Sequence, residues 1–88
     1  MTVQFRKRFL KDLAQLPSKP RQLIEEFAFQ EITRLSSLAQ SGNVEQLKGY
    51  PGFYKIRFGD YRVGLRVDGD AIIFERALHR KEIYRFFP

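Results

Sequence analysis

The sequence contains no cysteine and only one histidine, His79. Without cysteine the chain can form no disulfide framework and offers no thiolate ligands for a structural zinc ion. One imidazole and scattered carboxylates also leave few ligands for other transition metals. We therefore expect a protein without a cofactor, and any reaction that it catalyses is expected to be metal-independent.

Long hydrophobic runs are also missing from the sequence. No segment approaches the roughly 18 apolar residues that a membrane span needs. Charged side chains interrupt the first 15 residues, whereas a signal peptide has an unbroken apolar core. We therefore expect a cytoplasmic protein that does not associate with a membrane.

The 88 residues suffice for one small domain, residues 1–88, but not for a deep cofactor cavity. Apolar residues make up 43% of the chain, and nine phenylalanines and four tyrosines can build a core. Sixteen Lys and Arg residues outnumber ten Asp and Glu residues, for a net charge of +6 at pH 7. This charge favours binding to a polyanion or to an acidic protein and does not distinguish between them.

The first half of the chain has helical periodicity. Residues 2–5 indicate a short strand, and the spacing of apolar residues predicts a helix over residues 6–16, ended by Pro17. A second helix is predicted from about residue 18 up to Gly42, with a continuous apolar stripe. Together the two helices form a predicted helical hairpin.

In the second half, apolar residues alternate with polar ones from Leu47 onward. Turn signals separate three predicted strands, residues 53–58, 61–67 and 70–78. The last ten residues, 79–88, are predicted to include a short closing helix. The order β-α-α-β-β-β-α predicts an α+β domain, a small antiparallel sheet with the helices, above all the N-terminal helical hairpin, packed on one face.

The first two of these three strands carry an unusual charge pattern. If residues 59–60 form a two-residue turn, Arg57 lies opposite Arg62 and Lys55 lies opposite Gly64. One face of this hairpin is then apolar, and the other, the basic face, carries four cations: Lys55, Arg57, Arg62 and Arg66. Like charges opposite one another destabilise a sheet by up to about 1 kcal/mol per pair, so an anionic ligand is expected there. Gly64 would let a sugar-phosphate backbone approach the sheet.

A plainer interpretation of the basic face is also open. Small basic domains often expose lysine and arginine to solvent without any specific ligand. If residues 68–69 form the next turn, Glu75 falls opposite Arg62 and neutralises part of the charge. In the same register Arg76 falls on the apolar face, which only a shifted turn or an ion pair near the sheet edge would explain.

Two stretches of the sequence resemble one protein family. Residues 46–63, QLKGYPGFYKIRFGDYRV, are similar to the L-x-G…Y-K-I-R…Y-R centre of RelE-type toxins, and residues 78–84, LHRKEIY, to their closing H-R-x-x-x-Y segment. The resemblance to the RelE/ParE superfamily covers essentially the whole chain. It implies a RelE-like fold and identifies the chain as similar to the toxin of a type II toxin–antitoxin pair. Such a toxin is implied to cleave messenger RNA, usually on the ribosome, and the cleavage proceeds by attack of the 2′-OH on the phosphodiester.

The resemblance also implies roles for five residues. Lys55 matches a lysine that activates the 2′-OH, and Arg62 matches an arginine that clamps the phosphate. Arg57 stands where some members have a second lysine; a guanidinium does not deprotonate, so here it would hold the phosphate. Arg80 matches the residue that protonates the leaving group or stabilises the transition state, and Tyr84 matches an aromatic that stacks on or orients a base. Clustered cations suit metal-independent cleavage, because they stabilise the pentacovalent phosphate and lower the pKa of a neighbouring lysine.

Four further residues are candidates for the site. His79 is predicted on the basic face beside Arg80, as a general acid or base; a structural hydrogen bond is the alternative. Glu45 is either an alternative base or a solvated loop residue. Lys48 and Arg66 are candidate phosphate contacts or plain surface residues.

Two other functions stay open at this point. A ParE-like inhibitor of DNA gyrase would share the fold without nuclease activity, and an inactivated toxin would bind RNA or the ribosome without cutting. The resemblance implies that gyrase poisons lack the five clustered residues that this chain keeps, which favours cleavage. The expected partners are messenger RNA, the ribosome and a small acidic RelB-like antitoxin, partly disordered when free, that shields the basic face.

Overall fold

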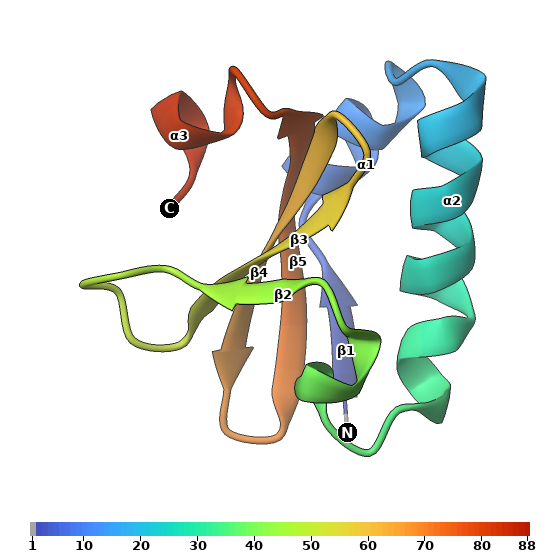
Figure 1. Ribbon diagram of the computed structural model, residues 1–88. Coiled ribbons are helices and arrows are strands. Elements are labelled where there is room, and N and C mark those ends of the chain that lie inside the picture. The colour runs from blue at the N-terminus through green and yellow to red at the C-terminus, as the bar shows by residue number, and fades with distance from the viewer. Residues whose placement is uncertain (1) are drawn as a thin grey trace.

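The computed structural model describes residues 2–88, which form a five-stranded sheet of order β1-β5-β4-β3-β2 with helices around it (Figure 1). The strands are β1 Thr2–Phe5, β2 Val44–Gln46, β3 Phe53–Phe58, β4 Tyr61–Asp68 and β5 Ala71–His79. The helices are α1 Lys7–Ala14, α2 Ser18–Phe29 and α3 Ile83–Phe86, with two short 3-10 helices, η1 Glu31–Arg34 and η2 Leu38–Ser41. The predicted α+β fold is confirmed.

The sheet is mixed. Strands β3 to β5 form the predicted antiparallel meander, and β2 extends it by pairing antiparallel with β3. Strand β1 runs parallel to β5, so the prediction of an antiparallel sheet is wrong for this strand. The turn between β4 and β5 lies at residues 69–70, one residue later than predicted, because Asp68 pairs with Ala71. The sequence pattern does not predict β2, because three residues are too few to show a period of two.

The helical hairpin of α1 and α2 packs on one face of the sheet, as predicted (Figure 1). The residues buried between them come from both helices and from β3, β4 and β5: Phe9, Leu13, Ile24, Phe27, Ile56, Val63, Leu65 and Phe74. Removing this apolar surface from water stabilises the arrangement. The prediction that all helices share one face is wrong for α3, which lies on the other side of the sheet (Figure 1).

The second predicted helix is shorter than expected. Helix α2 ends at Phe29, so the prediction of a continuous helix up to Gly42 is wrong. The hydroxyl of Thr33 donates a hydrogen bond to the carbonyl oxygen of Gln30 at 2.7 Å, and such side-chain bonds compete with helical backbone bonds. Ile32 is still fully buried, so the apolar stripe continues through η1 although the α-helix does not.

A β-bulge in β5 decides which way the second half of that strand faces. Leu65 pairs with Phe74 and Gly64 pairs with Arg76, which leaves Glu75 as the extra residue. Side chains alternate between the two faces of a strand, so one extra residue reverses the facing of every residue after it. The predicted facing of residues 76–79 is therefore wrong.

The reversal carries Arg76 off the apolar face to an ion pair at the sheet edge. Its Nε donates to Asp12 Oδ2 in α1 at 2.8 Å, and the same oxygen accepts the N–H of Ala77 at 3.1 Å. The hydrogen bond to Asp12 raises the pKa of Arg76, and desolvation by partial burial only partly opposes this. Of the two explanations offered from the sequence, the ion pair near the sheet edge is confirmed. The turn is also shifted, but that shift alone would leave Arg76 on the apolar face, so the bulge is what moves it.

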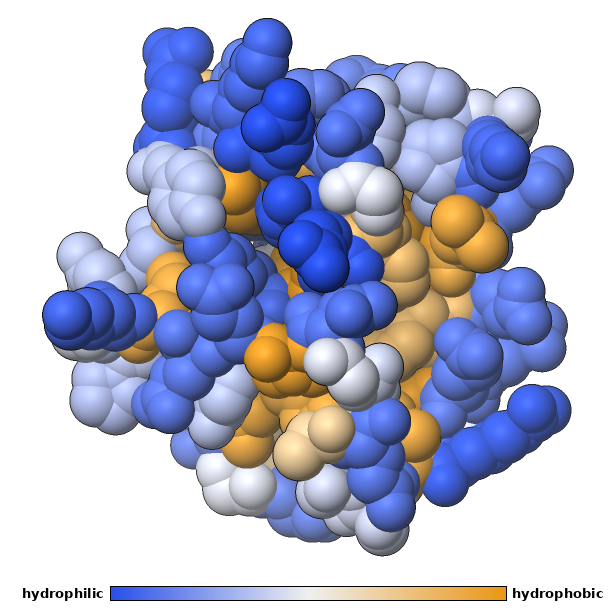
Figure 2. Space-filling model, in the orientation of Figure 1, coloured by the Kyte–Doolittle hydropathy of each residue, from blue (hydrophilic) through white to orange (hydrophobic). Residues whose placement is uncertain are grey.

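In the view of Figure 1, hydrophilic side chains cover most of the surface, and apolar residues appear between them (Figure 2). No helix between residues 2 and 88 has the length and apolarity that crossing a membrane requires. The large apolar side chains that remain exposed include Tyr50, Tyr84 and Phe86. The two tyrosines border the surface described next.

Candidate active site

The basic face predicted for the β3–β4 hairpin is present. Arg57 pairs with Arg62, and the whole predicted register of this hairpin is confirmed. Together with Tyr84 and residues 42–45, the side chains of Lys55, Arg57 and Arg62 line a hollow of about 360 Å³, which we call the cationic hollow. The structure thus brings together four of the five residues that the family resemblance marks.

Lys55 is largely enclosed, with 11% of its side chain exposed. Its ammonium group donates a hydrogen bond to the hydroxyl of Tyr84 and lies 4.2 Å from the centroid of that ring. Glu45 Oε1 lies 3.8 Å from Lys55 Nζ, because β2 pairs Glu45 directly with Lys55. The candidate bases Lys55 and Glu45 therefore form one cluster with Tyr84.

Arg57 and Arg62 are the uncompensated charges of the cationic hollow. Arg62 Nη1 donates to the carbonyl oxygens of Gly59 at 2.7 Å and Tyr61 at 3.0 Å, which hold the guanidinium at the hairpin turn. Among residues 2–88, no carboxylate forms an ion pair with either arginine. Because facing like charges destabilise a sheet, an anion bound between the two arginines would stabilise it.

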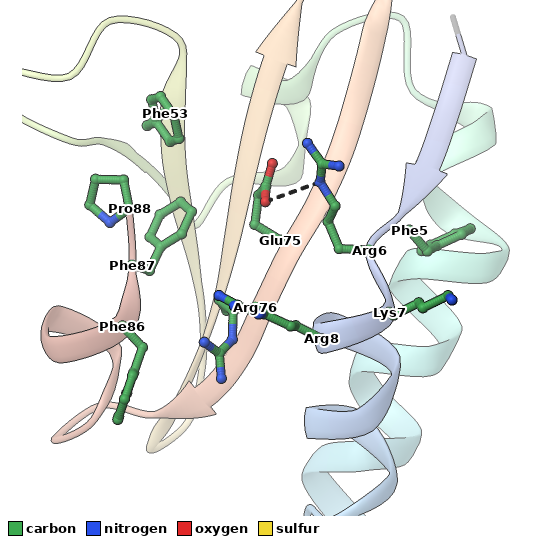
Figure 3. A pocket seen from close by; sticks show the side chains of 10 residues that line it. All are labelled: Phe5, Arg6, Lys7, Arg8, Phe53, Glu75, Arg76, Phe86, Phe87 and Pro88. Atoms are coloured by element: carbon green, nitrogen blue, oxygen red, sulfur yellow. Dashed lines mark ion pairs between the residues drawn. The ribbon is translucent and has the colours of Figure 1, made fainter.

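The carboxylate that was expected to neutralise Arg62 is directed elsewhere. Glu75, the bulge residue, lies 3.3 Å from Arg66 Nε and 3.4 Å from Arg6 Nε. Figure 3 shows Glu75 turned toward Arg6 at a separate hollow of about 730 Å³. Arg66 also contacts Asp68 at 3.4 Å. Glu75 therefore neutralises part of the basic face, as predicted, but through Arg66; its predicted position opposite Arg62 is wrong, because Arg62 pairs with Leu78.

Arg80 lies just beyond β5, beside the same turn as Arg62. Its backbone N–H donates to the carbonyl oxygen of Asp60 at 2.8 Å, and its Nε lies 3.5 Å from Asp60 Oδ1. Arg62 and Arg80 are thus held by neighbouring residues, Gly59 and Asp60. Arg80 is not among the residues that line the cationic hollow, and 54% of its side chain is exposed.

The prediction that His79 lies on the basic face is wrong. His79 pairs with Tyr61, and the two rings meet edge to face with centroids 5.3 Å apart. Its Nδ1 accepts the N–H of Lys81 at 3.1 Å. Tyr61 is on the apolar face, so His79 faces away from the cations, and the bulge at Glu75 is the physical reason. The alternative of a structural hydrogen bond is confirmed.

Gly64 serves the fold and not the ligand. A Cβ at this position would lie 2.7 Å from three atoms of the Phe87 ring. The missing side chain therefore makes room for a ring of the chain itself, and the prediction that it admits a sugar-phosphate backbone is wrong. Phe87 is buried, with its ring centroid 5.8 Å from that of Phe53. This contact fixes the C-terminal segment that carries Tyr84.

A second hollow of about 370 Å³ adjoins the first, and Lys48 lines it together with Lys55 and Tyr84. Tyr50, which the sequence analysis does not single out, lines the same hollow. The sequence does contain one signal that could have identified Tyr50. It is an aromatic residue inside a glycine-rich turn, where the hydrophobic core does not need one. We call this second depression the aromatic hollow.

Comparison with known proteins gives three consistent findings. The family model described as the ParE toxin of a type II toxin–antitoxin system, parDE, matches residues 3–84. The sequence is 44% identical to Toxin RelE3 of Methanocaldococcus jannaschii over 89 residues, 100% of both chains. In solved structures the chain is similar to one in the RelB–RelE antitoxin–toxin complex from Methanococcus jannaschii, with a TM-score of 0.83, 42% identity and coverage of 97% of this chain and 99% of that one. It is also similar to one in the RelBE2 toxin–antitoxin complex from Mycobacterium tuberculosis, with a TM-score of 0.69, 28% identity and coverage of 90% and 96%.

Proposed function

Because the chain belongs to the RelE/ParE superfamily and is a RelE-like toxin of a type II toxin–antitoxin system, we propose that it is a metal-independent endoribonuclease that cleaves messenger RNA on the ribosome. One observation carries the proposal: Arg57 and Arg62 face each other in the cationic hollow without a carboxylate partner among residues 2–88. A breaking phosphodiester gains negative charge in the transition state and would supply what the hollow lacks.

In this proposal Arg57 and Arg62 hold the scissile phosphate, since a guanidinium donates paired hydrogen bonds to phosphate oxygens. The 2′-OH gives its proton to the base of this cluster, Lys55 or the adjacent Glu45, and its oxygen forms a bond to phosphorus. The bond from phosphorus to the 5′-oxygen then breaks, and that oxygen takes a proton from water. The products carry a 2′,3′-cyclic phosphate and a 5′-hydroxyl.

The neighbouring groups have supporting roles in the proposal. Glu45, 3.8 Å from Lys55 Nζ, is the second group that can take the proton. Tyr84 orients Lys55 through its hydroxyl and presents an exposed ring to a base. Arg80, at the rim, stabilises the departing oxygen after its side chain leaves the exposed Asp60.

The proposed partner of the toxin is a small acidic RelB-like antitoxin. The relatives from Methanococcus jannaschii and Mycobacterium tuberculosis were solved as toxin–antitoxin complexes. A chain with a net charge of +6 attracts an acidic partner, and carboxylates placed between Arg57 and Arg62 would compensate their charges as a phosphate does.

A cleavage assay tests the proposal. The purified chain is added to a translating extract with a reporter messenger RNA, and the ends of the products are sequenced and analysed chemically. Cleavage that leaves 2′,3′-cyclic phosphate ends supports the nuclease, and a parallel reaction on free RNA with EDTA tests independence from ribosome and metal. Inhibition of gyrase supercoiling without any RNA cleavage would instead assign the ParE-like activity.

A further inference from the structure

The aromatic hollow shares three residues with the cationic hollow, Glu45, Lys55 and Tyr84. Its remaining lining comes from the end of β2, the turn after it and the C-terminal end of the chain: Gln46, Leu47, Lys48, Tyr50, Phe87 and Pro88. These two segments project on the same side of the sheet (Figure 1). The two hollows are therefore neighbours that meet at the Lys55–Tyr84 contact.

The aromatic hollow differs in character from its neighbour. The ring of Tyr50 meets that of Phe53 edge to face at 6.4 Å, and Phe53 lies 5.8 Å from Phe87, which rests on Gly64. This row of rings is thus fixed to the sheet, although Tyr50 is 52% exposed. Exposed aromatic rings next to clustered cations are the combination by which proteins bind single-stranded nucleic acid: the cations contact the backbone and the rings stack on the bases.

We propose that the aromatic hollow binds one nucleobase of the RNA next to the scissile phosphate, with Tyr50 as a substrate-positioning residue. This inference rests on the proposed function. A base is joined through its sugar to the phosphate, so its site must adjoin the site of the phosphate, and the shared Lys55 and Tyr84 meet this condition. Lys48, exposed at the edge of the aromatic hollow, contacts the following phosphate.

The test measures binding separately from cleavage. A short single-stranded 2′-fluoro RNA lacks the attacking hydroxyl, and in a series of such RNAs one abasic nucleotide is moved along the strand. Fluorescence anisotropy gives the Kd of each for the wild-type chain and for Tyr50→Ala. We expect one position at which loss of the base weakens binding by about 5- to 100-fold in the wild type, as for removal of one stacked base. In Tyr50→Ala the same loss should have little effect.

Two further variants make the result specific. Tyr50→Phe keeps the ring and should recover the sensitivity to the abasic position. Leu23→Ala removes another exposed apolar side chain, in α2 and outside both hollows, and should behave as the wild type. Thermal unfolding of each variant establishes that it is folded.

The outcomes separate this inference from the nuclease proposal. Binding that is insensitive to every abasic position, equal sensitivity in wild type and Tyr50→Ala, or no RNA binding by the wild type would each overturn the base site, even if RNA is cleaved. A position-dependent loss that requires Tyr50, found with a chain that cuts no ordinary RNA on or off the ribosome, would support the base site and reject the nuclease.

Discussion

Arg57 and Arg62 face each other across the β3–β4 ladder, and neither forms an ion pair within residues 2–88. Arg66, on the same two-stranded surface, lies 3.3 Å from Glu75 instead. Uncompensated positive charge is therefore concentrated at one point of the basic face. Because like charges that face each other disfavour the unliganded sheet, we propose that this point of the surface binds an anion.

Replacing Arg62 with alanine should lower RNA cleavage by at least about 100-fold, because the transition state loses a charged donor. The free energy of unfolding should stay the same or rise by up to about 1 kcal/mol, because the repulsion from Arg57 disappears. Arg66→Ala, in the same strand, is the matched control; it should change cleavage much less and lower stability by about 1 kcal/mol or less, because it loses partly exposed ion pairs. Equal cleavage by the wild type and Arg62→Ala would contradict the assigned site.

Lys55→Arg distinguishes a proton acceptor from a phosphate ligand. If Lys55 takes the proton of the 2′-OH, arginine at this position should abolish cleavage about as fully as alanine does, since a guanidinium stays protonated. Single-turnover rates on one messenger RNA measure this, with Glu45→Gln alongside. If Lys55→Arg still cleaves RNA and Glu45→Gln does not, Glu45 and not Lys55 is the base.

His79→Ala should cleave RNA at close to the wild-type rate, because the imidazole packs against Tyr61 on the face opposite the cations. The pH profile of cleavage should also keep its shape in the variant. The free energy of unfolding should fall by about 1 kcal/mol or less, because the edge-to-face contact with Tyr61 is lost. If the folded variant cleaves RNA at least about tenfold more slowly than the wild type, His79 takes part in catalysis after all.

Gly64→Ala should lower the free energy of unfolding by about 1–3 kcal/mol, because the new Cβ would lie 2.7 Å from the ring of Phe87. Urea unfolding measures the loss. In a Phe87→Ala background the same substitution should be much less destabilising, because the obstructing ring is gone. Strictly additive effects would show that Phe87 does not rest on Gly64.

Asp12→Ala should lower the free energy of unfolding by about 2–4 kcal/mol, because it leaves the partly buried guanidinium of Arg76 without its partner. The raised pKa of Arg76 predicts how this loss varies with pH. A group whose pKa is higher in the folded protein than in the unfolded chain stabilises the fold fully at any pH below its unfolded-state pKa. This stability is lost only as the pH rises through the folded-state pKa, which for an arginine lies above the pH range of the experiment. Urea unfolding at pH 7 and pH 10 should therefore show the same difference between wild type and variant.

The fold class and the site cluster were predictable because both depend on local rules. The two-residue turn at residues 59–60 sets the hairpin register, and alternation then assigns each side chain of β3 and β4 to a face. That is sufficient to place Lys55, Arg57 and Arg62 on one surface. The order of the predicted helices and strands likewise indicated an α+β domain with a helical hairpin over the sheet.

The errors lie where segments distant in the chain meet. Asp12 holds Arg76 from 64 residues away, beside a bulge that local alternation cannot reveal. Phe87 occupies the space above Gly64, and β2 brings Glu45 to Lys55.

The sequence by itself determined the type of fold, the hairpin register and the crowding of cations on one face, because neighbours along the chain decide these. Only the tertiary structure decided which cations remain without a partner, which face His79 takes and where the rings beside Tyr84 lie. The physical reason is that one extra residue in a strand, or one side chain from a remote helix, changes these contacts without altering any local pattern.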